Sequence, residues 1–297
     1  MVTLELTFQS LDQVALALQR AGYLADQATV TVAYLAARLG KPLLVEGPAG
    51  TGKTELARAI AEGTRTQLIR LQCYEGLDET KVLYEWNYRR QLLRLQADRR
   101  AEDQAEEWGR VEEDIFSAPF LLERPVLRAI RAKEPVVLLV DEVDRIEMET
   151  EALLLEVLSD FQVTIPELGT VAAEVRPFTV LTSNATRELS EALKRRCLYL
   201  WLDYPTIERE RAIVLTKVPG IEERLADEVV RVVRNLRQID LRKAPSIAET
   251  LDWARALGEL GIATLDVEAI RKTLSILLKH RSDIDRATQQ VAGEAAG

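Results

Sequence analysis

Short apolar runs alternate with helical patterns over roughly the first two thirds of the chain, and helical patterns alone follow. Five of the apolar runs are candidates for buried strands: Pro42–Glu46, Gln67–Leu71, Val136–Val140, Thr179–Leu181 and Leu198–Leu202. Strands that are separated by helices pair in parallel and bury both faces of the sheet. The pattern therefore predicts an α/β fold with a parallel sheet.

The segment before the first of these strands is expected to be mainly helical. Val2–Phe8 alternates like a short strand, and Ser10 with Gln13 three residues later resembles a capping box that starts a helix. A second helical pattern, Ala25–Leu39, runs into Gly40, and glycine favours the left-handed conformation that ends many helices.

Strand patterns stop after Tyr204 and Pro205. Four helical stretches follow: Ile207–Val218, Ile221–Leu236, Ser246–Leu260 and Val267–Leu278. Arg281–Gly297 loses this periodicity, which predicts a frayed tail. A chain of 297 residues exceeds the size at which one core grows comfortably. We therefore expect an α/β domain over residues 1–205, a smaller all-helical lid over 206–280 and a flexible tail over 281–297.

Composition narrows the class of protein. The chain is 47% hydrophobic and 29% charged, and none of its apolar runs approaches the length of a membrane span. The start of the chain shows neither a basic leader nor an apolar stretch before a cleavage site, so we expect a cytoplasmic location. The net charge of -9 disfavours a nucleic-acid partner, although it leaves a local basic patch open.

Cysteine and histidine indicate neither a metal centre nor a histidine-based catalyst. Cys73 and Cys197 are far apart without CxxC or Cys/His spacing, so we interpret both as buried small apolar residues. The single histidine, His280, follows an apolar helical stretch, where a cation at a helix end is the simpler explanation.

A glycine-rich loop directly follows the first core strand. It satisfies GxxxxGK[ST] and consists of Gly47, Pro48, Ala49, Gly50, Thr51, Gly52, Lys53 and Thr54. Glycines let such a loop curl with its N–H groups inward around an anion, and the following helix N-terminus adds a field that favours phosphate. We expect Lys53 to reach the β- and γ-phosphates of ATP and the Thr54 hydroxyl to bind Mg²⁺.

Two adjacent acids end the third core strand. Asp141 and Glu142 follow Val136–Val140 at the sheet edge where α/β proteins bind ligands. We predict that Asp141 holds Mg²⁺, directly or through water, and that Glu142 orients and deprotonates the attacking water. The plain alternative is that both acids begin a helix, but buried acids without a cation are costly. Asp144 and Arg145 either cap and pair locally or contact a neighbouring subunit.

The glycine-rich loop and the segment Val140–Arg145 together resemble the AAA+ ATPases, and the MoxR branch in particular. The resemblance implies a P-loop AAA+ parallel sheet flanked by helices, with an all-helical lid. Asn184, which follows the strand Thr179–Leu181, matches sensor 1, a residue that helps to position the hydrolytic water. Arg196, with Arg195 as the alternative, matches the arginine finger that acts on a neighbouring subunit's ATP.

The resemblance leaves two contacts open. Many relatives carry a sensor 2 arginine where this chain has Ser246 and Ile247, and the candidates to replace it are Arg242, Lys243 and Arg255. The loop that corresponds to Tyr23 and Leu24 contacts adenine in AAA+ relatives, whereas Tyr23 is equally well explained as an ordinary core aromatic.

Three further segments are similar to a MoxR subgroup associated with maturation of molybdenum-copper carbon monoxide dehydrogenase: Gly22–Asp26, Leu71–Asp78 and Glu249–Leu257. The resemblance implies a ring, with a hexamer as the expected size. It also implies a chaperone that remodels or matures a client metalloenzyme, assists metal insertion and works with a von Willebrand factor A domain protein. The alternatives are a nucleic-acid NTPase and a slow nucleotide-dependent binding switch.

One polar stretch stands outside this picture. Arg89–Glu113, between the second and third core strands, is dense in Arg, Gln, Asp and Glu. It is either a solvated helix without a partner or a docking surface for a client or partner.

Overall fold

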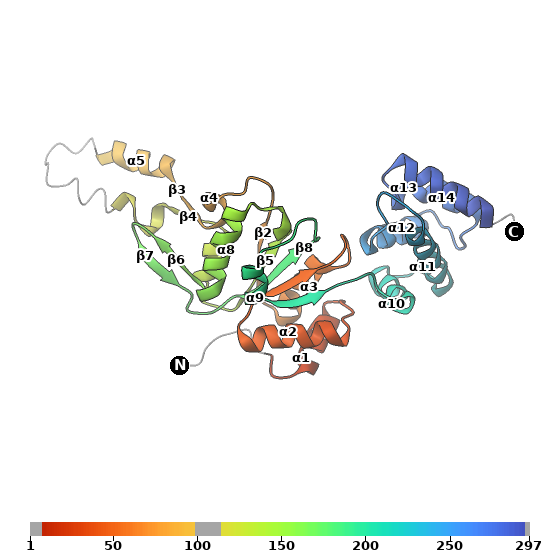
Figure 1. Cartoon of the computed structure of the whole chain (residues 1–297), viewed down its shortest axis with the longest axis horizontal. Helices are drawn as coiled ribbons and strands as arrows, with labels where there is room; N and C mark the ends of the chain where they lie inside the picture. The colour runs from red at the N-terminus through yellow and green to blue at the C-terminus, as the bar shows by residue number, and fades with distance from the viewer. Residues whose placement is uncertain (1–7, 99–113, 295–297) are drawn as a thin grey trace.

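Five parallel strands form the centre of the computed structural model, which describes residues 8–98 and 114–294 (Figure 1). Their order in the sheet is β2-β5-β8-β1-β9. The strands are β1 (Leu43–Glu46), β2 (Gln67–Gln72), β5 (Val136–Asp141), β8 (Phe178–Ser183) and β9 (Leu198–Trp201). The α/β fold with a parallel sheet is thus confirmed, and each of the five predicted core strands forms.

Both faces of the sheet are covered, which explains why its central strands are continuous apolar runs. Along β5, Leu138 and Val140 pack on one face, and Val137 and Leu139 pack on the other. The helices that contribute to the two faces are α1 (Leu11–Arg20), α2 (Gln27–Leu39) and α3 (Lys53–Thr64) on one side, and α7 (Pro125–Ile130), α8 (Met148–Asp160) and α9 (Glu191–Arg196) on the other.

The predicted start of the first N-terminal helix at Ser10 and the predicted end of the second at Gly40 are confirmed, whereas the second helix starts later than predicted. The Ser10 hydroxyl accepts a bond from the Gln13 N–H at 3.3 Å and caps α1. Asp26 accepts from the Thr29 N–H at 2.7 Å, so α2 begins at Gln27, two residues later than the apolar pattern indicates. Gly40 ends α2 with a left-handed φ of 59°. The strand predicted over residues 2–8 lies outside the described residues apart from Phe8.

Two small antiparallel sheets of two strands each lie outside the main sheet, and neither is predicted from the sequence. β3 (Tyr84–Trp86) pairs with β4 (Leu121–Glu123), and β6 (Gln162–Ile165) pairs with β7 (Gly169–Ala172). Short elements beside them are α4 (Glu79–Val82), η1 (Ala118–Phe120) and η2 (Val143–Arg145). α5 (Tyr88–Asp98) agrees with the helix predicted for the start of the polar stretch, whose residues 99–113 lie outside the described residues.

A separate group of helices with its own core follows β9, at the opposite end of the molecule from α5 (Figure 1). Trp253 is fully buried in this core, and its indole Nε1 donates to the Thr273 hydroxyl at 2.8 Å. The helices are α10 (Ile207–Lys217), α11 (Glu223–Gln238), α12 (Ile247–Glu259), α13 (Val267–Leu277) and α14 (Arg281–Glu294).

Helix α14 stands where the sequence predicts a frayed tail. Ala287 is 0% exposed in the helical core, and Asp283 accepts the backbone N–H groups of Arg242 and Lys243 at 3.1 and 3.3 Å. The backbone groups that Asp283 binds lie about 40 residues away in sequence, and Ala287 adds only a small apolar side chain. The local apolar pattern therefore does not predict this helix.

The cysteine interpretation is confirmed. Cys73 and Cys197 are both free and buried, and burial raises the pKa of each thiol to about 12. Among residues 8–98 and 114–294, no helix combines the length and apolar character that crossing a membrane requires.

Helices α1 and α3 approach so closely that Gly63 has no room for a side chain, since an added Cβ would overlap the Ala17 carbonyl group. We expect Gly63→Ala to lower the free energy of unfolding by about 1–3 kcal/mol, because overpacking displaces one helix. Gly258→Ala is the matched control: this helical glycine faces open space, and alanine there should be neutral or stabilising. Urea unfolding of both variants measures the difference, and equal midpoints would contradict the tight contact.

Candidate nucleotide-binding site

The glycine-rich loop connects β1 to α3 in the predicted way. Gly47, Gly50 and Gly52 have φ values of 151°, 75° and 97°, which favour glycine because they lie in the left-handed region or close to it. At Gly47 the backbone also passes so close to the Leu202 carbonyl group that a Cβ would overlap it. The loop therefore requires glycine both for its curl and for its contact with β9.

Lys53 lies inside this loop. Its Nζ donates to the carbonyl oxygens of Gly47 and Pro48, both at 2.7 Å, and the residue is only 6% exposed. Burial lowers the pKa of the Lys53 ammonium, and the nearby carboxylates of Asp144 and Asp141 oppose that shift. The ammonium thus sits in a desolvated position where its attraction to phosphate is strong.

Asp141 is the most enclosed of the predicted ligands, at 2% exposure. Its Oδ1 accepts from the hydroxyls of Thr54 at 2.9 Å and Thr182 at 2.6 Å. Its Oδ2 accepts from Arg70, from Nε at 3.0 Å and from Nη2 at 2.5 Å. The structure therefore brings the two predicted magnesium ligands, Thr54 and Asp141, into direct contact.

Glu142 follows Asp141 in a left-handed conformation with φ of 58°. Its backbone N–H donates to the Thr182 hydroxyl at 2.9 Å. Its Oε2 lies 2.8 Å from Arg145 Nε and accepts from Gln72 Nε2 at 3.2 Å. A left-handed glutamate is uncommon, and here it turns the side chain out of the strand direction and toward the cavity.

Residues beyond the third and fourth predicted strands complete this edge of the sheet. Asn184, the sensor 1 candidate, follows β8 and lines the same cavity as Asp141 and Glu142. Asp144 is buried and accepts from the backbone N–H and the hydroxyl of Thr186 at 3.1 and 2.6 Å. Arg145, as described, pairs with Glu142.

Arg196 and Arg195 are not part of this cavity. Both are exposed at the end of α9, and Arg196 Nη1 donates to the Ala192 carbonyl of its own helix at 3.2 Å. The structure thus keeps the finger candidates away from the site of their own chain.

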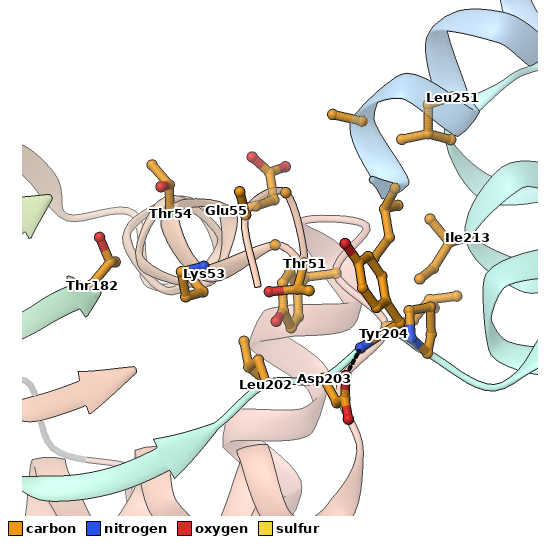
Figure 2. Close-up of a pocket in the computed structure, with 18 of the residues that line it drawn as sticks. Thr51, Lys53, Thr54, Glu55, Thr182, Leu202, Asp203, Tyr204, Ile213 and Leu251 are labelled. Carbon is orange, nitrogen blue, oxygen red and sulfur yellow. Dashed lines mark hydrogen bonds between the residues drawn. The ribbon is translucent and has the colours of Figure 1, made fainter. Parts of the chain in front are cut away.

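The cavity has a volume of about 770 Å³ and lies between the glycine-rich loop and the helices α10 and α12. Figure 2 shows Lys53, Thr54 and Thr182 on its sheet side and Ile213 and Leu251 on its helical side, with Tyr204 between them. A volume of this size falls within the range of small-molecule sites.

Tyr23 and Leu24 both line this cavity, at the turn between α1 and α2. Tyr23 is only 9% exposed, and its burial raises the pKa of the phenol. The Leu24 carbonyl accepts from Arg209 of α10, from Nε at 3.1 Å and from Nη2 at 2.7 Å. The tyrosine is thus a core aromatic and a cavity wall at once, so both interpretations of it stand.

The helical region touches the glycine-rich loop directly. The Ile247 N–H donates to the Gly50 carbonyl at 3.2 Å, and a Cβ on Gly50 would overlap the Ser246 side chain. Of the three residues considered as replacements for a sensor 2 arginine, Arg255 is among the residues that line the cavity, whereas the Lys243 ammonium pairs with Glu249 at 3.0 Å.

The donor set suits Mg²⁺. Thr54 and Asp141 offer a hydroxyl and a carboxylate oxygen side by side, and oxygen ligands are those that magnesium prefers. Within the described part of the chain no cluster of three or more His, Cys, Asp and Glu side chains could hold a metal alone. Magnesium sites that use one or two protein ligands with substrate phosphates need no such cluster.

Four residues of the site escape the sequence analysis. Thr182 stands out only as a hydroxyl in an apolar strand, and Arg70 and Gln72 follow the period-two pattern of an ordinary solvent face. Arg209 contacts Leu24 and Asp26 across more than 180 residues, and nothing in its own neighbourhood indicates this.

Several known proteins resemble this chain at low sequence identity. Uncharacterized proteins of Staphylococcus aureus (strain bovine RF122 / ET3-1) and Staphylococcus haemolyticus (strain JCSC1435) are 28% and 26% identical over 246 residues, which is 80% of this chain and 84% of each relative. A mutant of Thermotoga maritima RuvB is 19% identical, with a TM-score of 0.48 over 91% of this chain and 71% of that one.

A second structure, described as the Thermotoga maritima RuvB Holliday junction branch migration motor, is 20% identical with a TM-score of 0.43, over 84% of this chain and 67% of that one. The family model of the AAA domain (dynein-related subfamily) matches residues 42–197, which include the glycine-rich loop, Asp141, Glu142, Asn184 and Arg196. This chain therefore belongs to the AAA domain family, in its dynein-related subfamily.

Proposed function

We propose that this protein hydrolyses ATP and uses the cycle to remodel or mature a client enzyme, as a MoxR-type AAA+ chaperone. The observation that carries the proposal is the convergence of Lys53, Thr54, Asp141, Glu142 and Asn184 on one cavity. They come from the ends of β1, β5 and β8, which are neighbours in the sheet. A phosphate cradle beside a carboxylate base is the arrangement that nucleotide hydrolysis needs.

Binding of the triphosphate is assigned to the loop and to Lys53. The N–H groups of the curled loop and of the start of α3 would face the phosphates, and their partial charges favour an anion. Lys53 would exchange its bonds to the Gly47 and Pro48 carbonyls for bonds to phosphate oxygens, at little cost because it already lies there.

Hydrolysis is assigned to Glu142, with Asn184 beside it. Glu142 would accept a proton from the attacking water, and Asn184 would donate a hydrogen bond that holds the water in line. Thr182 fixes the start of Glu142 by accepting its backbone N–H. Mg²⁺, held by Thr54 and Asp141, would supply neutralisation of the charge on the phosphates.

The purine ring of the nucleotide is assigned to the part of the cavity that offers apolar contact. This part is lined by Tyr23, Leu24, Ile213 and Leu251. Because Ile213 and Leu251 belong to α10 and α12, a bound base would contact the helical region directly. We propose that this region, residues 206–280, acts as a lid whose position depends on the nucleotide.

Arg196 is proposed to act on a neighbouring subunit. It is exposed, it is not among the residues that line the cavity of its own chain, and its guanidinium donates to a carbonyl of its own helix. A cation that completes a neighbour's site requires a closed ring, for which a hexamer is our proposal. An arginine supplied in this way is typically worth about 10³ to 10⁵ in rate.

A protein is the partner that the charge of the chain favours. With 48 acidic and 39 basic residues, the chain lacks the overall positive charge on which binding to nucleic acid depends. We propose a metalloenzyme as the client, with carbon monoxide dehydrogenase as the class that the three subgroup segments indicate, and a von Willebrand factor A domain protein as co-worker.

Substitutions at Lys53 and Glu142 should affect nucleotide binding and ATP turnover separately. We expect Lys53→Ala to weaken ATP binding, because it removes the phosphate contact. Glu142→Gln should keep binding and lower kcat by about 10² to 10⁴, the usual worth of a general base. Calorimetric titration and steady-state ATPase rates measure the two effects.

The same assays separate the rival functions. Wild-type turnover that equals that of Glu142→Gln would leave a binding switch as the better description. Stimulation of the ATPase by double-stranded DNA at physiological salt, and not by a client protein, would favour a nucleic-acid motor.

Mixed rings test the role of Arg196. Arg196→Ala and Glu142→Gln should each be inactive alone, and co-assembly should recover part of the ATPase, because some interfaces then pair an intact arginine with an intact base. Mixed assembly is verified by differently tagged subunits. Verified mixed rings without recovered activity would argue against action between subunits.

Disturbing the contact between the glycine-rich loop and the proposed lid should weaken nucleotide binding. Gly50→Ala adds a Cβ that overlaps Ser246, at a φ of 75° where alanine is strained. Because overpacking costs about 1–3 kcal/mol, we expect ADP affinity to fall by about one to two orders of magnitude. Gly50→Ala combined with Ser246→Gly should recover part of this loss, and a double variant no better than Gly50→Ala would contradict the contact.

A further inference from the structure

Arg70 joins the two acids of the site. This residue of β2 donates to Asp141 Oδ2 from Nε at 3.0 Å and from Nη2 at 2.5 Å. The Asp141 side chain is 3% exposed and that of Arg70 is 42% exposed, so the cation reaches inward from the surface to a buried anion. Hydrogen bonds between charged groups are about twice as strong as neutral ones.

The two oxygens of Asp141 have different partners as a result. Oδ2 is bound by Arg70, whereas Oδ1 accepts from the hydroxyls of Thr54 and Thr182. Rotation of the carboxylate would break four hydrogen bonds at once. Arg70 therefore helps to fix the plane of the carboxylate, so that one oxygen points away from the guanidinium and lies beside the Thr54 hydroxyl, on the side that we assign to Mg²⁺.

The same guanidinium also reaches the next acid, Glu142, through Gln72, and Arg145 pairs with the same Glu142 oxygen at 2.8 Å. Arg70 Nη2 donates to Gln72 Oε1, and Gln72 Nε2 donates to Glu142 Oε2 at 3.2 Å. An amide between a cation and a carboxylate has one favourable orientation, with its oxygen toward the cation and its N–H toward the anion. Without Arg70 the Gln72 amide oxygen loses the donor that holds it, and the amide N–H keeps only its acceptors, the Cys73 carbonyl and Glu142.

The sheet register makes this double contact possible. Gln72 stands opposite Asp141 in the ladder between β2 and β5, and Arg70 stands opposite Leu139. The guanidinium therefore extends along the strand toward its carboxyl end, where both acids lie. A planar group with several N–H donors can serve two partners at fixed angles, whereas a lysine ammonium is a single point of charge on a flexible stem.

We propose that Arg70 is a positioning residue of the ATP site, which holds Asp141 for the metal and, through the Gln72 amide, orients Glu142 for the attacking water. The proposal rests on the proposed ATPase function and adds to it a link between metal binding and water activation. Arg70 itself would touch neither the metal nor the attacking water, so its effect would be exerted through Asp141 and Gln72.

An ordinary ion pair would behave differently. Partly exposed pairs contribute little to stability, and one without a role in the site would leave turnover unchanged when removed. Arg131 provides the matched control, because it pairs with Glu123 at 2.7 Å and its side chain is 35% exposed, outside the residues that line the cavity.

The experiment uses the full chain with Arg70→Met, Arg70→Lys, Gln72→Leu and the control Arg131→Met. Affinity for the non-hydrolysable analogue AMP-PNP is titrated with MgCl₂ and with EDTA, and steady-state ATPase gives kcat and KM. Thermal unfolding reports whether each variant folds. Should Arg70→Met fail to fold, Arg70→Lys and Gln72→Leu still test both contacts.

In the wild type, MgCl₂ should raise the affinity for AMP-PNP above its value in EDTA. We expect this gain to be about 10–100-fold smaller in Arg70→Met, the usual effect of removing a residue that orients a metal ligand. The affinity of Arg70→Met for AMP-PNP in EDTA should stay close to that of the wild type. Its kcat should fall by about the same factor, with a smaller change in KM. Gln72→Leu should lower kcat and keep the gain from MgCl₂, because Arg70 still holds Asp141. Arg70→Lys should restore only part of either quantity, and Arg131→Met should match wild type.

An unchanged gain from MgCl₂ in Arg70→Met, or a kcat equal to that of Arg131→Met, would overturn the proposal. A wild-type protein that binds AMP-PNP with magnesium but does not turn over ATP would contradict the proposed function instead. In that case the titrations alone still decide whether Arg70 positions Asp141.

Discussion

The Asp141 carboxylate is buried from water, so it needs hydrogen-bond donors from the protein, and the neighbouring strands and helix α3 supply them. A buried carboxylate without donors would cost several kcal/mol. Asp141 instead receives bonds from α3, β8 and β2, through Thr54, Thr182 and Arg70. Because each donor stands on a different element, the carboxylate holds its bonds only when the sheet register and the position of α3 are both correct. The geometry of the acids therefore depends on the whole α/β core.

The cavity is built by two parts of the chain that meet at a few contacts. The Ile247 N–H binds the Gly50 carbonyl, Lys217 lies 3.2 Å from Glu55, and Arg209 binds the turn between α1 and α2. Two of these contacts involve the loop and the helix that we assign to phosphate binding. A change in that loop would reach the helical region directly, because the two surfaces are already in contact. In the cycle that we propose, this contact would connect nucleotide turnover to the helices.

The sequence by itself determined the fold class and the chemical core of the site. Continuous apolar strands with helices between them can form a stable core only as a parallel sheet covered on both faces. Parallel strands bring their carboxyl ends to one edge, so a GxxxxGK[ST] loop after one strand and Asp141–Glu142 after another had to lie close together. Local chemistry also located the helix cap at Ser10 and the helix end at Gly40, because capping uses residues within one turn of the helix end.

Only the tertiary structure decided the contacts that join distant parts of the chain. Arg70 and Gln72 look like solvent-facing positions of a strand until β2 pairs with β5 and places them beside Asp141 and Glu142. The anchoring of α14 through Asp283 and the contact of Arg209 with Leu24 likewise depend on partners about 40 and more than 180 residues away. A periodic pattern records which face of an element is buried, but it carries no information about which distant side chain will arrive there. The donors around a buried charge are therefore visible only once the chain has folded.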